Sequence, residues 1–297
     1  MAQEFSHVLN VISKNAGPLA VDIGRWLGPW LGQSPLSWLS PDYAFDAPFT
    51  GDAKKALTEA RAQTKGLAAD INVVATAGRR KRLLIADMDS TIINCECLDE
   101  LAGIAGLRKK VAGITERAMR GEIEFTAALR ERLGLLKGLP LEALERVWHD
   151  RVRLNPGAKE LTATMKANGA RTLLVSGGFT FFTGRVAEAA GFDSHQSNVL
   201  YDDGKALTGE VREPIMGRTA KLQALERALQ QYGLKPQDVL AVGDGANDLE
   251  MIQRAGLGVA YHAKPVVAAA ASASIAHGDL KALLYLQGYR EEEIVSS

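Results

Sequence analysis

Three short apolar runs, each ending abruptly in small or acidic residues, constrain the fold of this 297-residue chain more than any other feature. They are residues 82–86 before Asp87-Met88-Asp89, residues 171–175 before Ser176-Gly177-Gly178, and residues 239–242 before Gly243-Asp244-Gly245. Each run leads towards a helical pattern. Strands alternating with helices predict a parallel sheet whose ligands bind beyond the carboxyl ends of the strands. We therefore expect an α/β protein with a Rossmann-like parallel sheet.

The length predicts about two domains. Residues 1–78 are expected to form a small N-terminal α/β domain, with strands at 8–13 and 71–75, helices at 17–30 and 53–65, and an irregular proline-rich stretch at 34–48. Residues 79–297 are expected to form the second domain. A long insert at about 98–165 separates its first two strands. Because this insert is rich in Leu, Ala, Glu and Arg at helical spacing, it predicts several helices.

Composition excludes several classes of function. The 35 Lys and Arg residues balance the 35 Asp and Glu residues, whereas a general nucleic-acid binder needs surplus positive charge. The chain lacks an apolar stretch long enough for a transmembrane helix, and its first residues do not resemble a signal peptide. Two cysteines argue against a disulfide-dense secreted scaffold. The sequence predicts a soluble cytoplasmic protein with no nucleic-acid or membrane partner and leaves open whether it forms a homodimer.

The acidic pair after the first strand is the strongest chemical signal. Asp87 and Asp89 are one residue apart at a strand end, so both carboxylates can project into the same crevice. Their proximity is electrostatically unfavourable unless a cation lies between them, and Mg²⁺ with oxygen ligands fits this need. An EF-hand loop also begins Asp-x-Asp, but it needs Gly at its sixth position and Glu at its twelfth. Those positions hold Ile92 and Leu98, so we reject the EF-hand.

A second acidic segment follows the third strand. The sequence Gly243-Asp244-Gly245-Ala246-Asn247-Asp248 would bring two more carboxylates to the same sheet edge, and its glycines would let the backbone turn tightly. Taken alone, this segment could equally be a solvated turn. With Asp87 and Asp89 on a neighbouring strand end, it indicates a binding site.

Two further segments suit an anion. The hydroxyl of Ser176 and the backbone N–H groups around Gly177 could cradle an oxyanion. Lys221 lies at the start of a helix predicted over residues 219–231, where its ammonium group and the helix terminus both favour negative charge.

In this order, the four motifs resemble those of the haloacid dehalogenase superfamily of phosphatases: strand–Asp-x-Asp-x-Thr, strand–Ser-Gly, Lys, and Gly-Asp-Gly-x-Asn-Asp. The resemblance covers residues 82 to about 288. Within the superfamily, Glu96 and the stretch from Met119 to Phe125 that leads to Arg132 are similar to the phosphoserine phosphatases. Relatives often carry a regulatory ACT-type domain at the N-terminus. The pattern of residues 1–78 predicts the succession β-α-β-α-β, which has one strand fewer than an ACT-type domain.

The resemblance implies Mg²⁺-dependent hydrolysis of O-phospho-L-serine, a small-molecule substrate, to L-serine and phosphate in serine biosynthesis. It implies that Asp87 is the nucleophile that becomes an aspartyl-phosphate and that Asp89 is the general acid and base. The implied metal ligands are the Asp87 side chain, the Asp89 backbone carbonyl and Asp244, with Asp248 behind them. The implied substrate-binding residues are Ser176, Gly177 and Lys221 for the phosphate, Glu96 for the ammonium, Arg132 for the carboxylate, and Asn247.

Two alternatives remain at this point. The same chemistry could act on another small phosphomonoester, or transfer the phosphoryl group to another alcohol. The chain could instead be a non-catalytic sensor of serine or phosphoserine. The intact set of Asp87, Asp89, Lys221 and Asp244 argues against a sensor, which has no use for a nucleophile.

Overall fold

The computed structural model describes residues 5–26, 36–119 and 122–296. Contacts within the chain divide it into two compact units. The first unit contains residues 1–84, 156–171 and 234–297, and the second contains residues 85–155 and 172–233. None of the helices in the described ranges has the length and apolar character of a membrane-spanning segment.

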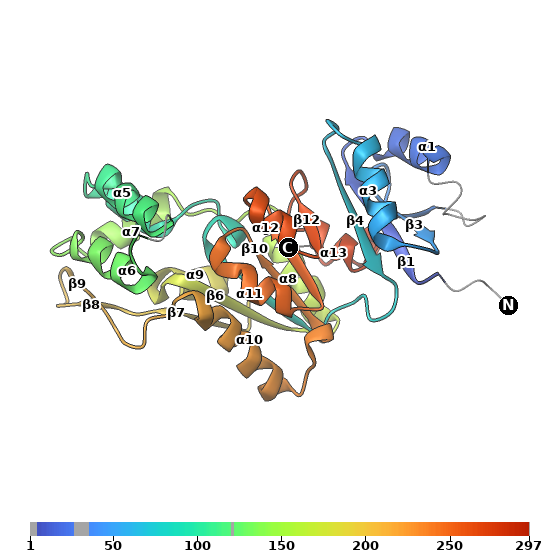
Figure 1. Ribbon diagram of the computed structural model, residues 1–297. Helices are drawn as coiled ribbons and strands as arrows, with labels where there is room; N and C mark the ends of the chain where they lie inside the picture. Colours follow the sequence, from blue (N-terminus) through green and yellow to red (C-terminus); the bar gives the residue numbers. More distant parts are fainter. Residues whose placement is uncertain (1–4, 27–35, 120–121, 297) are drawn as a thin grey trace. The chain divides into compact units, whose positions relative to one another are not determined.

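The N-terminal part of the first unit is a four-stranded antiparallel sheet with the strand order β2-β3-β1-β4. Figure 1 labels three of its strands, β1, β3 and β4, and the helices α1 and α3. Its described elements run β-α-β-β-α-β, a ferredoxin-like succession, which has one strand more than the sequence predicted. Its elements are β1 (His7–Ser13), α1 (Ala16–Trp26), β2 (Ser37–Ser40), β3 (Ala44–Phe49), α3 (Ala53–Gln63) and β4 (Ala69–Ala75).

The prediction of an irregular stretch at 34–48 was wrong for its described part, which contains β2 and most of β3. Asp42, with a left-handed φ of 54°, lies in the tight turn that joins these strands. Pro48 pairs with Val8 of β1 but lies beyond the part of β3 that pairs with β2. Proline is tolerated at such a locally unpaired edge. The end of the helix predicted over 17–30 lies outside the described residues.

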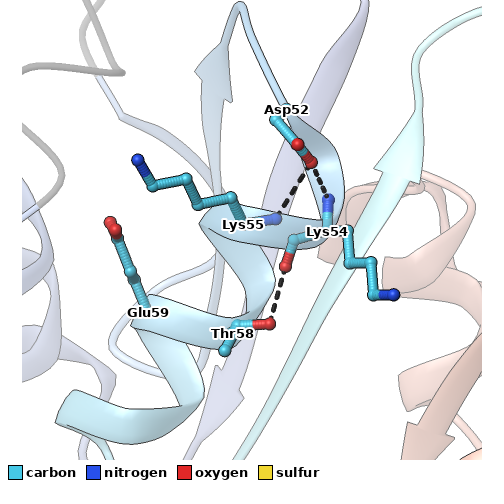
Figure 2. Close-up of a pocket in the computed structure, with 5 residues that line it drawn as sticks. All are labelled: Asp52, Lys54, Lys55, Thr58 and Glu59. Atoms are coloured by element: carbon cyan, nitrogen blue, oxygen red, sulfur yellow. Dashed lines mark hydrogen bonds between the residues drawn. The ribbon is translucent and has the colours of Figure 1, made fainter.

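One face of this sheet is apolar because alternate side chains of each strand point the same way. The buried side chains on it pack with those of both helices: Leu9, Val11, Phe45, Ala47, Phe49 and Ile71 from the strands, and Ala16, Leu19, Ala20, Ile23, Ala56 and Ala60 from α1 and α3. Helix α3 begins where the carboxylate of Asp52 accepts hydrogen bonds from the N–H groups of Lys54 (2.9 Å) and Lys55 (3.0 Å) (Figure 2).

The opposite face carries buried polar residues that bind the C-terminal part of the same unit. Asp70 accepts hydrogen bonds from the N–H groups of Ala276 and Gly278, both at 2.7 Å. The amide of Asn72 exchanges two hydrogen bonds with the backbone of Ser274. The N-terminal sheet is therefore joined to residues 274–278 by specific hydrogen bonds.

The rest of the first unit alternates strands and helices, as predicted. Its parallel ladders pair Leu240 with Leu257 and Val259 with Ala273. The elements are α8 (Ala158–Ala167), β10 (Val239–Gly243), α11 (Leu249–Arg254), β11 (Leu257–Tyr261), α12 (Pro265–Ala270), β12 (Ala273–Ile275) and α13 (Ala282–Leu286). The parallel sheet has the strand order β12-β11-β10-β5-β6-β7, with β5 at Leu83–Ala86, which confirms the predicted fold class.

The second unit contains β6 (Arg171–Phe179), α9 (Thr180–Ala190), β7 (Ser194–Asn198) and α10 (Arg218–Tyr232). The expected helices of the insert are α4 (Cys97–Ile104), α5 (Arg108–Met119), α6 (Phe125–Gly134) and α7 (Glu142–Asp150). A hairpin of β8 (Leu200–Asp202) and β9 (Leu207–Val211) joins this insert: Gly138 N–H donates to the Leu207 carbonyl at 2.8 Å, and Leu207 N–H donates to the Leu139 carbonyl at 2.9 Å.

Candidate active site

The residue that directly follows β5 is Asp87, and its carboxylate is buried. Lys221, in the first turn of α10, places its Nζ 2.5 Å from Asp87 Oδ1. Only 3% of the Lys221 side chain and 7% of the Asp87 side chain are exposed. Removing one partner of such a pair leaves an uncompensated buried charge, so the two are strongly dependent on each other.

A tight turn over Met88–Ile92 carries the chain away from β5. Ser90 has a left-handed φ of 56°, an uncommon conformation for a residue with a Cβ atom. Its N–H donates to the Cys95 carbonyl at 3.3 Å, and its hydroxyl donates to Glu96 Oε1 at 2.6 Å. The turn therefore ties the start of α4, where Glu96 lies, to the end of β5.

Asp89 is held from two sides. Its Oδ1 accepts the Cys97 backbone N–H at 3.0 Å, and its Oδ2 accepts the Ser176 hydroxyl at 3.3 Å. Burial, and next the negative charge of Glu96, raise the pKa of Asp89 to about 7, against the lowering effects of the Cys97 hydrogen bond and of Lys221. Near neutral pH this carboxyl can therefore both donate and accept a proton.

Residues 176–178 form a bulge in β6. Val175 pairs with Gln196 and Phe179 pairs with Asn198, so three residues of β6 face the single residue Ser197 of β7. The buried Ser176 hydroxyl accepts the Gly178 N–H at 2.8 Å. A Cβ atom on Gly178 would lie 3.0 Å from Asp89 Oδ2. Glycine at this position lets the bulge approach Asp89 closely.

The helical insert brings a ring to this bulge. A Cβ atom on Gly177 would lie 3.7 Å from Cζ of Phe125, and a Cβ atom on Gly217 would lie 3.4 Å from Cδ1 of the same ring. Phe125 is the first residue of α6, and Gly217 directly precedes α10. The ring of Phe125 therefore lies against both predicted phosphate-binding segments.

Arg132, on α6, donates to the Thr115 hydroxyl at 3.4 Å and to the Ala128 carbonyl at 3.3 Å. Burial lowers the pKa of Arg132, whereas the negative charges of Asp99 and Glu96 raise it. The structure thus places Arg132 within the electrostatic reach of Glu96. Sequence reasoning missed Asp99, which has no motif around it and reads as an ordinary charge on a helix.

The acidic segment after β10 is built around close approaches to two glycines. A Cβ atom on Gly243 would lie 2.4 Å from Cγ of Asp248, and one on Gly245 would lie 2.3 Å from Oδ1 of Asn247. Asp248 is buried and accepts the Gly245 N–H at 3.0 Å. Neither glycine has a left-handed φ. The close approaches show that the glycines leave space for the side chains of Asp248 and Asn247.

Asp87, Asp244 and Asp248 offer carboxylate oxygens that all lie within 4.8 Å of one another. Such a set of hard oxygen donors fits a divalent ion of the Mg²⁺ type, which binds through one or two carboxylates and keeps several waters. Asp248, expected to stand behind the ligands, is a member of this group.

The parallel sheet, the helical insert and this acidic cluster define a class of hydrolase. Residues 81–256 match the family of haloacid dehalogenase-like hydrolases, described as a hydrolase family. This match spans more than half of the chain.

Individual relatives narrow the class. Over 234 residues the chain is 44% identical to a phosphoserine phosphatase of Archaeoglobus fulgidus, covering 78% of this chain and 68% of the relative. Over 210 residues it is 47% identical to a phosphoserine phosphatase of a Polaromonas species, covering 69% of this chain and 89% of the relative. The solved structure of a probable phosphoserine phosphatase from Vibrio cholerae matches with a TM-score of 0.79 and 32% identity, over 96% of this chain and 87% of that one. The chain therefore belongs to the phosphoserine phosphatase family of the haloacid dehalogenase-like hydrolases.

Proposed function

We propose that this protein hydrolyses O-phospho-L-serine to L-serine and inorganic phosphate, with Asp87 as the nucleophile. The observation that carries the proposal is the buried Asp87–Lys221 pair beside Asp89, a carboxyl whose pKa is raised to about 7. A related phosphoserine phosphatase has been solved as a phospho-aspartyl intermediate analogue, at 39% identity and a TM-score of 0.64 over 69% of this chain and 98% of that one. Covalent chemistry at an aspartate therefore has a precedent in a relative.

In the first step, an Asp87 oxygen attacks phosphorus and the bond from phosphorus to the serine oxygen breaks. Asp89 gives its proton to that departing oxygen, which leaves as the serine hydroxyl. Lys221 offsets the charge repulsion between the attacking carboxylate and the phosphate dianion. Ser176 and the N–H groups around Gly177 would hold the phosphate oxygens.

In the second step, the ionised Asp89 takes a proton from a water molecule, whose oxygen attacks the phosphorus of the aspartyl-phosphate. The bond between Asp87 and phosphorus breaks, phosphate leaves, and Asp87 is regenerated as a carboxylate. One residue thus acts as acid and then as base. A pKa of about 7 suits both tasks, because neither protonation state is strongly disfavoured near neutral pH.

We propose Mg²⁺ as the metal. The Asp87 side chain, the Asp89 backbone carbonyl and Asp244 would hold it, with Asp248 in the same acidic group. When bound, the ion supplies positive charge that neutralises the transferring phosphoryl group.

Specificity for phosphoserine would come from the helical insert and the start of α4, because Ser176, Gly177 and Lys221 would contact only phosphate. Glu96 would pair with the substrate ammonium, and Arg132 would bind the carboxylate through its planar fork. The ring of Phe125 would cover the phosphate beside Gly177. The insert over about 98–165 would act as a cap that excludes water from the intermediate.

Phosphate release from O-phospho-L-serine and from a panel of other phosphomonoesters tests the proposal, with and without Mg²⁺. We expect a strong preference for O-phospho-L-serine that requires the metal and is lost in Asp87→Asn. Equal rates across the panel would favour a broader phosphatase. Phosphoserine binding without any phosphate release would favour the sensor.

A further inference from the structure

A buried amide joins the two segments that would bind phosphate. Asn198 is the last residue of β7, and only 2% of it is exposed. Its Nδ2 donates to the Gly177 carbonyl at 2.8 Å and to the Met216 carbonyl at 3.4 Å, and its Oδ1 accepts the Met216 N–H at 2.7 Å. This single side chain thus bonds to the backbone of the β6 bulge and to the backbone just before α10.

We propose that Asn198 is a positioning residue that fixes the distance between the β6 bulge and the first turn of α10. The inference rests on the proposed function, in which the bulge and Lys221 hold the same phosphoryl group. No motif in the sequence marks this asparagine, which follows the polar run Ser194-His195-Gln196-Ser197.

The bulge explains why such a residue is needed. Three residues of β6 face one residue of β7 here, so the regular ladder cannot satisfy the backbone of residues 176–178. Asn198 supplies the Gly177 carbonyl with a donor from its side chain. The same residue that pairs with Phe179, where the ladder resumes, therefore also holds the bulge in place.

The second segment to which Asn198 bonds leads directly into α10, which carries the Lys221 ammonium group. Met216 is followed by Gly217 and then by α10, whose first turn carries Lys221. A Cβ atom on Gly177 would lie only 3.9 Å from the Met216 carbonyl oxygen, so the two segments run close together. A displacement of about 1 Å between catalytic groups can cost about 100-fold in rate. Loss of the Asn198 bonds would permit such a displacement.

The test measures the Kd of inorganic phosphate by titration calorimetry in Mg²⁺, together with kcat and KM for O-phospho-L-serine and the melting temperature. Asn198→Ala removes all three bonds. Asn198→Asp has the same shape and keeps the acceptor for Met216 N–H but loses the donors. We expect each variant to raise the phosphate Kd and KM together and to lower kcat/KM, each by about 10- to 100-fold.

Asn72→Ala is the matched control. Asn72 is also buried and also exchanges bonds with a backbone segment, at Ser274, but it lies on β4 and bonds to neither segment that Asn198 joins. It should lower the melting temperature to a similar extent and leave the phosphate Kd and KM within twofold. A merely structural role for Asn198 predicts the same pattern for both asparagines.

The inference is overturned if folded Asn198→Asp or Asn198→Ala keeps the phosphate Kd within twofold of the parent. If Asn198→Ala does not fold, Asn198→Asp and Asn198→Ser decide by the same measurement. A parent protein that binds phosphate but does not hydrolyse O-phospho-L-serine would contradict the proposed function, while the effect of Asn198 on the phosphate Kd would still be measured.

Discussion

Replacing Arg132 by alanine tests how the protein distinguishes phosphoserine from other phosphomonoesters. The guanidinium is partly buried, and the hydrogen bonds that hold it, to Thr115 and Ala128, are long at 3.4 and 3.3 Å. A substrate carboxylate is a stronger acceptor than either group, because it carries a full negative charge. We therefore expect the guanidinium to bind a carboxylate without disrupting the fold of α6.

The magnitude follows from the strength of a charge-assisted hydrogen bond, about 1.5–3 kcal/mol net. At about 1.4 kcal/mol per decade, Arg132→Ala should lower kcat/KM for O-phospho-L-serine by about 10- to 150-fold. Phosphoethanolamine is the same molecule without the carboxylate, and its kcat/KM should change less than threefold. Arg132→Lys keeps the charge but loses the planar fork, so its kcat/KM for O-phospho-L-serine should lie between the values of the parent and of Arg132→Ala.

The assay is phosphate release from both substrates at saturating Mg²⁺. Arg117→Ala is the control, because Arg117 is an exposed arginine on the same insert that pairs with Glu131 at 3.3 Å. Arg117→Ala should change kcat/KM for neither substrate by more than twofold. Equal losses on both substrates in Arg132→Ala would refute the carboxylate assignment and indicate a structural or phosphate-binding role. No loss of kcat/KM on either substrate would mean that Arg132 is a solvated charge that does not contact the substrate.

Three further predictions follow from the same site. Chelation of metal should abolish turnover, Mg²⁺ should restore it, and Ca²⁺ should not, because Ca²⁺ takes more ligands at longer distances; robust turnover in Ca²⁺ alone would contradict this. In the metal-free protein, the raised pKa of Asp89 means that the folded state binds more protons than the unfolded state between about pH 4 and 7. The free energy of unfolding should therefore fall by up to about 4 kcal/mol as pH rises through this range. Urea unfolding of Asp89→Asn at several pH values should not show this fall. Finally, beryllium fluoride should slow hydrogen exchange in α5 and α6 if the insert closes as a cap; unchanged exchange would count against closure.

The grouping of the acidic residues at the candidate site could be predicted from the sequence, because each of them follows a strand that local patterning already identifies. Asp87 comes directly after the apolar run at 82–86, and Asp244 follows the run at 239–242 by one glycine. Parallel strands present their carboxyl ends at one edge of a sheet, so the order of the runs is enough to group these residues. The division at residue 78 and the extent of the cap at 98–165 stay predictions.

Other features depend on contacts that no local pattern records. β2 and most of β3 lie in a proline-rich stretch, in which β3 pairs with β1 and β2 pairs with β3. Asn198 acquires its contacts only because β6 bulges at residues 176–178. The pKa of Asp89 is raised first by burial, which is a property of the folded chain. Each of these is set by tertiary structure, which overrides local propensity.

The central claim is that Asp87 attacks phosphorus and becomes a covalent aspartyl-phosphate. The most direct measurement is an acid-quenched single turnover with O-phospho-L-serine radiolabelled at phosphorus, in the presence of Mg²⁺. The label should appear on the protein within the first turnover, map to Asp87 and be released by hydroxylamine. Asp87→Asn, which removes the attacking charge at nearly constant volume, should carry no label and release no phosphate above a few per cent of the parent rate. Full phosphate release without labelled protein, or an active Asp87→Asn, would contradict the account.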